Sequence, residues 1–435
     1  MTSHSTAAPD AAMREALAEL GLEPRLVSTN DAEAFEAWLQ VAARGFLDQE
    51  LTAEQVGSAH GRLGYRRLVG VHDPFAPVPN SPVATIASWI AELTVPGGRG
   101  IPSSAISAVT VAPTHTRRGI GRAMVEEELR LAASEGVPVA VLTVSESTLY
   151  GRYGFGPAAL AGSLKIDTKR ARWVGPAPQG RVDYISRDRA RELLPELHEA
   201  VRLRSPGELE MPGGHWDSIA WTRPDAKDSG KHRAMQYTDP AGEVRGVALY
   251  SVAANHDDFT KATATVTYLV AETPDAYAAF WRFLLQLPLV GELRANLQLV
   301  DEPVRWMIDD QRAATVTVVD HQYVRIIDVP GALQARTFGA PGALALDVSD
   351  PQGLATGRWI LRVDDQGAGT VTPWEDEAPV DAVAVRLGIT ELSAAYLGGV
   401  SLATLAAAGR VQATDASTAT RIFSWHVTPR LSFWY

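Results

Sequence analysis

The stretch at residues 109–130, VTVAPTHTRRGIGRAMVEEELR, constrains the fold of this chain more than any other. A β-branched run ends at a proline, arginines and glycines follow, and the remainder has the apolar spacing of a helix. Glycines let backbone N–H groups approach an anion closely, and the start of a helix adds a partial positive charge. The stretch therefore predicts a strand, a phosphate-binding loop and a helix.

Two familiar phosphate loops do not match residues 116–122, TRRGIGR. A Walker A loop needs Gly-Lys-Ser/Thr, which is absent, and a dinucleotide fingerprint would need a third glycine where Met124 stands. Arginine adds charge-assisted hydrogen bonds, so a pyrophosphate site of another kind is the functional interpretation. The structural alternative is an arginine-rich helix start that is exposed to solvent.

The residues around this stretch predict a mixed α/β domain. Residues 105–111 and 139–144 are apolar nearly throughout, as expected for strands that are covered on both faces of a sheet. Gly136 and Pro138 end the helix between them. Helical periodicity is present over residues 31–51, and strands are expected over residues 67–71 and 83–93.

A second unit repeats the order strand, turn, helix, strand. We expect its strands over residues 262–270 and 293–300 and its helix over residues 276–287, without the glycine–arginine loop. The last third alternates strands and turns and adds a small-residue helix at residues 402–409. These patterns predict three domains, at residues 1–165, 166–313 and 314–435.

Composition excludes several classes of protein. The net charge is −11, from 51 acidic and 40 basic residues, which argues against a general nucleic-acid binder and favours cationic partners. The chain has no cysteine, so disulfides and a cysteine nucleophile are excluded. We expect no membrane span, because no apolar run approaches about 20 residues. The first ten residues lack signal-peptide features, so we expect a cytoplasmic protein.

We also expect no metal site. His115, His215 and His321 lack the spacing of known metal motifs.

The strand, the loop and the later segment ESTLYGRYGFGPA resemble the GNAT superfamily of acetyl-CoA-dependent N-acetyltransferases. The loop departs from the family pattern at its first position, where Thr116 replaces Arg or Gln. The resemblance implies that the strand contacts the pantetheine arm, that the loop holds the pyrophosphate and that the end of the next strand also contacts the cofactor. The implied cofactor-binding residues are Val109, Thr110, Val111, Arg117, Arg118, Gly119, Ile120, Gly121, Arg122, Ser145 and Glu146.

The whole chain resembles the Eis (enhanced intracellular survival) family. The resemblance is carried by SAVTVAPTHTRRGIGRAM, by YVRIIDVPGAL and by a sterol-carrier-protein-like last domain that ends in an aromatic residue. It implies two GNAT-like domains in tandem, acetylation of several amines on polycations such as aminoglycosides, and a homohexamer. A lysine or polyamine acetyltransferase, and a non-catalytic protein that binds acetyl-CoA or lipid, remain as alternatives.

Amine acetylation needs a base near the amine and an acid near the thioester sulfur. Tyr150 is the candidate acid, since a phenol of pKa about 10 suits proton transfer to a thiolate whose pKa is about 8.5 or higher in an apolar site. The alternative is a core tyrosine. Three aromatic residues end the chain, and we expect this end to be buried together with its carboxylate. The resemblance implies that the α-carboxylate of Tyr435 is the general base; simple docking of the terminus is the alternative.

Acidic residues are the candidates for binding a cationic amine. Asp48 matches an acidic position in the cavity of Eis-like proteins, Glu50 is more simply a surface acid, and Asp328 lies in the segment RIIDV. Trp434 stands where some Eis relatives carry an acid, so the substrate does not follow directly from the resemblance.

Overall fold

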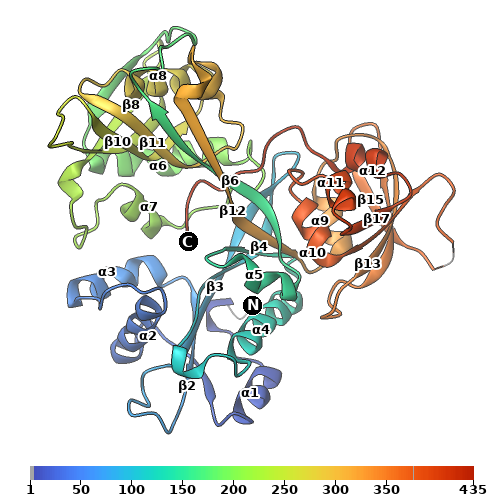
Figure 1. Cartoon of the computed structure of the whole chain (residues 1–435). Helices are drawn as coiled ribbons and strands as arrows, with labels where there is room; N and C mark the ends of the chain where they lie inside the picture. The colour runs from blue at the N-terminus through green and yellow to red at the C-terminus, as the bar shows by residue number, and fades with distance from the viewer. Residues whose placement is uncertain (1–3, 376) are drawn as a thin grey trace. The chain divides into compact units, whose positions relative to one another are not determined.

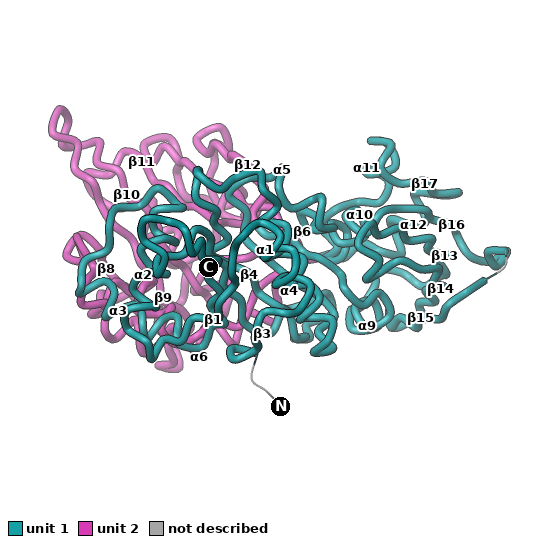
Figure 2. Tube along the Cα trace, turned by 90° about the horizontal axis from the view of Figure 1, so that it is seen from below, with its two compact units in different colours: residues 1–158, 322–426, 435 teal, residues 159–321, 427–434 magenta. Residues whose placement is uncertain are grey.

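The computed structural model describes residues 4–375 and 377–435, which divide into two compact units (Figure 2). Unit 1 holds residues 1–158, 322–426 and 435, and unit 2 holds residues 159–321 and 427–434. The chain therefore leaves unit 1 twice and returns to it twice. Residues 1–3, part of the N-terminal stretch behind the localisation prediction, lie outside the described residues.

The first part of unit 1 is built on six strands in the order β1-β2-β3-β4-β5-β12. Neighbouring strands are antiparallel except β4 and β5, which are parallel and are connected through helix α4. The strands are β1 (Glu23–Leu26), β2 (Arg67–His72), β3 (Ala84–Val95), β4 (Arg99–Val111), β5 (Val139–Thr143) and the final residues, 322–326, of β12 (Ala314–Ile326).

Helices cover both faces of these strands (Figure 1). Leu68 and Val69 are adjacent in β2 and point to opposite faces, where each joins a separate buried apolar cluster. One cluster contains residues of α1 (Ala11–Ala18) and α4 (Ile120–Ser134), and the other contains residues of α2 (Ala32–Gly45) and α3 (Ala53–Leu63).

The C-terminal part of unit 1 has a separate sheet in the order β15-β14-β13-β16-β17. Its strands are β13 (Gly342–Ser349), β14 (Gly357–Val363), β15 (Gly369–Pro373), β16 (Val383–Gly388) and β17 (Val411–Ala413). Its helices are α9 (Val329–Ala335), α10 (Ile389–Ala395), α11 (Leu402–Ala407) and α12 (Ala416–Phe423).

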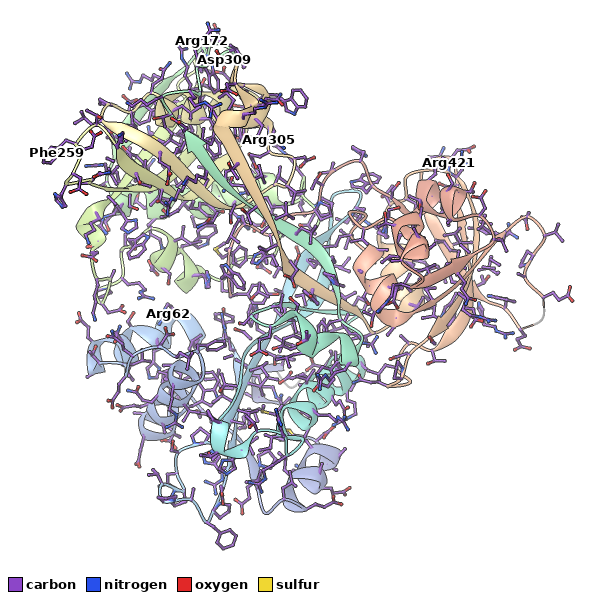
Figure 3. The ribbon with its side chains drawn as sticks, in the orientation of Figure 1. Arg62, Arg172, Phe259, Arg305, Asp309 and Arg421 are labelled. Carbon is purple, nitrogen blue, oxygen red and sulfur yellow. The ribbon has the colours of Figure 1, made fainter. Side chains whose placement is uncertain are left out.

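Unit 2 repeats the strand arrangement of unit 1, in the order β7-β8-β9-β10-β11-β6. Again only one neighbouring pair, β10 and β11, is parallel. Arg172 and Asp309 pair at 2.9 Å on its surface (Figure 3). The strands are β6 (Gly156–Asp167), β7 (Arg181–Ile185), β8 (His232–Thr238), β9 (Val244–Ala253), β10 (Ala262–Ala271) and β11 (Val290–Gln298), with helices α6 (Arg187–Arg202), α7 (Gly213–Ile219) and α8 (Pro274–Leu285).

The predicted mixed α/β architecture is confirmed, with one correction to its local structure. The helix expected over residues 31–51 ends at Gly45. A Cβ at Gly45 would collide with the side chain of Thr110, and Leu47 then takes a positive φ of 62°. Thr52 and Gln55 form a capping box that starts α3. The chain therefore turns where we expected it to continue as a helix.

The C-terminal part of unit 1 holds the turn around Gly154 in place. The Arg325 side chain is fully buried, donates to the Tyr153 carbonyl at 2.7 Å and pairs with Asp350 at 2.6 Å. Thr390 of α10 donates to the Gly151 carbonyl at 3.2 Å. These contacts fix the segment that immediately follows Tyr150.

We expect Gly154→Ala to destabilise unit 1 by about 3 kcal/mol. Gly154 has a φ of 83°, and a Cβ there would lie 2.5 Å from Arg325 Nε and 2.7 Å from Ile389 Cγ2. Urea unfolding would measure the change. Gly409→Ala is the matched control, because its φ is 72° and nothing lies within 4 Å of the added Cβ. Equal losses in the two variants would contradict the steric explanation.

Candidate active site

The parallel strands β4 and β5 separate at the point where the sequence predicts cofactor contacts. Their pairing runs only from Ser103–Val139 to Ile106–Leu142, although β4 continues to Val111. Ala108 has a φ of 52°, and β4 carries one extra residue against β3 at this point. The bulge bends β4 away from β5, so residues 107–111 leave their backbone groups on that side without a β5 partner.

Val109, Thr110 and Val111 all lie beyond this separation. The Thr110 side chain is buried, and its Oγ1 lies 2.8 Å from Oγ1 of Thr85. Val109 and Val111 are half-buried. These residues are not paired with β5, so their backbone groups on that side are available to an extended amide-containing arm such as pantetheine.

The loop that follows is shaped to present backbone N–H groups at the start of α4. Arg117 and Gly119 both have positive φ, at 63° and 87°. The helix has no side-chain cap and no acidic residue in its first turn. A Cβ at Gly119 would meet nothing within 4 Å, and one at Gly121 would meet only Val111 Cγ2 at 3.8 Å. The open start of a 15-residue helix fits a pyrophosphate.

The other predicted loop residues have separate roles. Arg117, Arg118 and Arg122 are exposed, and Arg118 also donates to the Leu20 carbonyl at 3.0 Å. Ile120 is buried beneath the loop as the first residue of the helix. Three exposed guanidinium groups therefore surround the start of α4.

The corresponding loop of unit 2 cannot hold a pyrophosphate in the same way. Thr273 caps α8 by accepting a hydrogen bond from the Ala276 N–H. Asp275 lies in the first turn, where its carboxylate accepts from the Tyr237 hydroxyl and the Gln179 N–H. A helix start that already has a cap and a carboxylate does not attract a second anion.

Tyr150 ends the short helix α5 (Ser147–Tyr150), which follows β5. Its ring packs edge-on against Phe155 at 6.0 Å. Among the described residues its hydroxyl has no hydrogen-bond partner. Burial, with smaller contributions from Tyr153 and Glu146, raises the pKa of Tyr150 to about 12, so the phenol is protonated at neutral pH. Ser145 and Glu146 are exposed in the turn between β5 and α5.

The terminal residue Tyr435 lies at the end of β5 within unit 1. Thr143, the last residue of β5, donates from Oγ1 to a terminal carboxylate oxygen of Tyr435 at 3.4 Å. The Tyr435 ring packs edge-on against Trp89 at 5.1 Å. Burial raises the pKa of its phenol, beside Arg66 and the amide of Gln322.

Sequence reasoning missed the residues that surround the Tyr435 ring. Arg66 is stacked over Trp89 at 4.0 Å and donates to the Tyr65 hydroxyl at 3.0 Å. Gln322 pairs with Thr143 across β5 and β12. The available signals were a polar residue in the apolar end of β12, Gln322, and a charged residue just before β2, Arg66. The expected burial of the chain end holds for Phe433, which is 5% exposed, but not for Trp434, which is 48% exposed.

The predicted acidic residues are not brought together. Asp48 is exposed in the turn after α2, where its N–H donates to the Ala43 carbonyl at 2.9 Å. Asp328 is also exposed, and its N–H donates to the Pro138 carbonyl at 3.1 Å, next to the first residue of β5. Thr143 and Tyr435 lie at the other end of this strand, about 13 Å away.

His115 pairs with Asp73 at 3.1 Å on the outer side of the loop. Within residues 4–375 and 377–435, no group of three or more His, Asp or Glu side chains is placed to hold a metal ion. No helix in the same ranges is both long and apolar enough to cross a bilayer.

Comparison with known proteins agrees with this arrangement. Residues 27–158 and 207–326 each match an acetyltransferase (GNAT) domain family, and residues 329–432 match the sterol carrier protein domain family. The strand separation, the open helix start and these matches define a GNAT acetyltransferase, a class that implies the use of acetyl-CoA.

Similarity to relatives along most of the chain identifies the family within the GNAT acetyltransferases. An uncharacterized N-acetyltransferase of Streptomyces avermitilis is 35% identical over 399 residues, 88% of this chain and 91% of the relative. N-acetyltransferase Eis of Mycobacterium tuberculosis is 33% identical over 353 residues, 79% of this chain and 83% of that protein. The solved structure of Eis1 from Mycobacterium abscessus has a TM-score of 0.80 at 26% identity, covering 95% of this chain and 100% of that chain. The chain belongs to the Eis-like N-acetyltransferases.

We expect Gly119→Ala to weaken acetyl-CoA binding about tenfold or more, because the added methyl group enters the space in front of the α4 N–H groups and strains a positive φ. Isothermal titration calorimetry would measure the dissociation constant. Gly136→Ala, at the other end of the same helix, is the matched control, since its φ is 71° and no atom lies within 4 Å of the new Cβ. Unchanged affinity in Gly119→Ala would remove the loop from the binding site.

Proposed function

We propose that this protein transfers acetyl groups from acetyl-CoA to primary amines of polycationic small molecules such as aminoglycosides, at more than one position on each molecule. Tyr150 is the general acid and the terminal carboxylate of Tyr435 is the general base. The observation that carries this proposal is the placement of the Tyr435 carboxylate 3.4 Å from Thr143, at the end of β5 that leads into α5 and Tyr150.

The Tyr435 carboxylate supplies the base that the reaction needs. An ammonium group has no lone pair, so it loses a proton before the nitrogen attacks the thioester carbon. A carboxylate offers about four lone-pair acceptor sites, so the hydrogen bond from Thr143 is compatible with accepting that proton. Because the group belongs to the main chain, the Tyr435 phenol is not required.

Tyr150 supplies the proton, or the hydrogen bond, that the departing sulfur needs. As the carbon–nitrogen bond forms, the carbon–sulfur bond breaks and negative charge develops on sulfur. A phenol whose pKa is raised to about 12 by burial is fully protonated at neutral pH. Complete transfer to a free thiolate of pKa about 8.5 is uphill, so its main contribution is a hydrogen bond to sulfur in the transition state.

The charge of the protein supports a cationic substrate. The net charge of −11 favours the approach of polycations, and the exposed Asp48 is a candidate contact. Asp328 lies at the far end of β5, so within this proposal it would contact only a distant part of a large substrate. We also propose a homohexamer in the cytoplasm, which size-exclusion chromatography with light scattering and cell fractionation would test.

The function is tested by thiol release from acetyl-CoA with aminoglycosides, polyamines and a lysine peptide. The protein has no cysteine, so the thiol signal comes from coenzyme A alone. More than one equivalent of thiol per aminoglycoside supports the proposal. Turnover only with polyamines or the lysine peptide would contradict aminoglycosides as the substrate class and favour the amine that reacts. Acetyl-CoA binding without any turnover would oppose the proposal.

We expect Tyr150→Phe to lower kcat about 100-fold while acetyl-CoA binding is unchanged, because only the transition-state hydrogen bond is lost. Stopped-flow thiol release would measure kcat. Since the pKa of Tyr150 is raised to about 12, the wild-type enzyme should show no loss of kcat from Tyr150 ionisation between pH 7 and 10. Tyr153→Phe, at a neighbouring buried tyrosine, is the control and should retain activity.

We expect two glycines appended after Tyr435 to lower kcat at least tenfold, because the carboxylate moves away from Thr143. Tyr435→Phe is the matched control, since it keeps the main-chain carboxylate in place and should retain most of the activity. Full activity in the extended chain would exclude the terminal carboxylate as the base, whatever the substrate.

A further inference from the structure

Unit 2 repeats the strand separation seen in unit 1. The parallel pairing of β10 and β11 ends at Val266–Ala295, and β10 then continues to Ala271. One extra residue of β10 follows directly after Val266, as in the bulge of β4. In unit 1 this geometry exposes backbone groups for an extended ligand, so the same question applies to unit 2.

The C-terminal segment, residues 427–434, lies at this separation. Arg430 and Ser432 line the same cavity as Leu269, Val270 and Ala271 of β10. The cavity that remains is about 170 Å³, below the roughly 300 Å³ at which ordinary ligand pockets begin. The position that corresponds to the cofactor arm in unit 1 is therefore partly filled by the protein's own chain.

Glu208 holds the first part of this segment. Its buried carboxylate accepts hydrogen bonds from the Ser432 N–H at 3.2 Å and the Ser432 hydroxyl at 3.0 Å, and Arg430 lies 3.7 Å from it. The Arg430 N–H also donates to the Pro206 carbonyl at 2.8 Å. Backbone and side-chain contacts together fix the direction of the segment.

Two histidines hold the next two carbonyl groups. His321 Nε2 lies 3.1 Å from the Phe433 carbonyl, and His215 Nε2 lies 2.9 Å from the Trp434 carbonyl. A carbonyl oxygen only accepts, so each Nε2 carries the proton. Burial lowers the pKa of His321 to about 4, so its ring is neutral at pH 7. His198 and His215 also pack against the Phe433 ring, at 6.2 and 5.6 Å.

We propose that the second GNAT-like domain is a clamp for the catalytic chain end, with Glu208, His215 and His321 as positioning residues. The proposal rests on the proposed role of the Tyr435 carboxylate. The Trp434 carbonyl belongs to the peptide bond that joins Trp434 to Tyr435, so the hydrogen bond from His215 restrains the residue to which Tyr435 is covalently attached. The domain has kept the strand separation of an acetyltransferase and uses it to hold the base instead of a cofactor.

The test is a double-mutant cycle between His215 and the position of the terminal carboxylate. His215→Leu removes the donor to the Trp434 carbonyl, and two glycines after Tyr435 displace the carboxylate while keeping that carbonyl. In the native-length chain we expect His215→Leu to lower kcat about three- to tenfold, the equivalent of one hydrogen bond, with KM and acetyl-CoA affinity unchanged. In the extended chain we expect no additional loss.

Three controls separate positioning from a general loss of stability. His215→Gln keeps an N–H donor and should restore most of the kcat. His256→Leu, at an exposed histidine of unit 2 away from residues 427–434, should behave as wild type. Glu208→Gln removes the charge of a second anchor and should repeat the loss of kcat. A thermal-unfolding midpoint for each variant shows that it is folded at the assay temperature.

The outcomes are distinguishable. Equal losses from His215→Leu in both chains, or no loss in the native-length chain, would overturn the clamp. Full activity of the extended chain with His215 unchanged would instead overturn the proposed role of the Tyr435 carboxylate as the base. That measurement needs no histidine variant. If His215→Leu lowers kcat only in the native-length chain, and His215→Gln recovers it, both the clamp and the terminal base are supported.

Discussion

The separation of two parallel strands is the constraint on which the rest of this structure depends. β4 and β5 pair for four residues and then diverge at a bulge, and β10 and β11 repeat that geometry in unit 2. Backbone groups at such a point need partners from outside the sheet. In unit 1 the loop and the open start of α4 follow the separated part of β4 in the sequence, whereas in unit 2 residues 427–434 and residues 269–271 of β10 line one cavity. The same backbone geometry thus occurs in two different surroundings.

The helix that carries the phosphate loop is also secured by buried charge. Arg67 of β2 is fully buried and contacts both Glu127 and Glu128 of α4, with Glu127 at 2.7 Å. Burial and the neighbouring Glu128 raise the pKa of Glu127 to about 7 despite the attraction of Arg67. One arginine between two carboxylates fixes the position of α4 along the sheet. The phosphate loop at the start of α4 is thereby held at the same place along the sheet.

The sequence predicted the elements that local patterns define. The loop and α4 were predicted correctly because glycine, arginine and helical periodicity occur within 22 residues, and the tandem repeat followed from the same order of elements near residues 262–300. Residues 168–260 gave no comparable signal. Helix α6 contains Pro195 and is polar overall, and β8 mixes charged and apolar residues, so tertiary packing determines both.

The candidate catalytic residues could be predicted only where a single residue type and its position in the sequence suggested the role. Tyr150 and Tyr435 could be selected from their types and positions. The sequence could not point to the residues around Tyr435, which are Trp89, Arg66 and Gln322. Each of them is more than 100 residues away from Tyr435 in the sequence. The anchors of residues 427–434 were hidden for the same reason. His215 and His321 were considered only as metal ligands, although each lies against a main-chain carbonyl.

The interruption of unit 1 by unit 2 has a consequence for synthesis on the ribosome. Strand β5 ends at Thr143, and one of its two neighbours within unit 1, residues 322–326 of β12, is translated about 180 residues later. At a translation rate of roughly 5–20 residues per second, this edge of the nascent sheet stays unpaired for about 10–40 s. An unpaired strand edge is prone to join other chains. During that interval the nascent chain exposes the edge of β5 that residues 322–326 later cover.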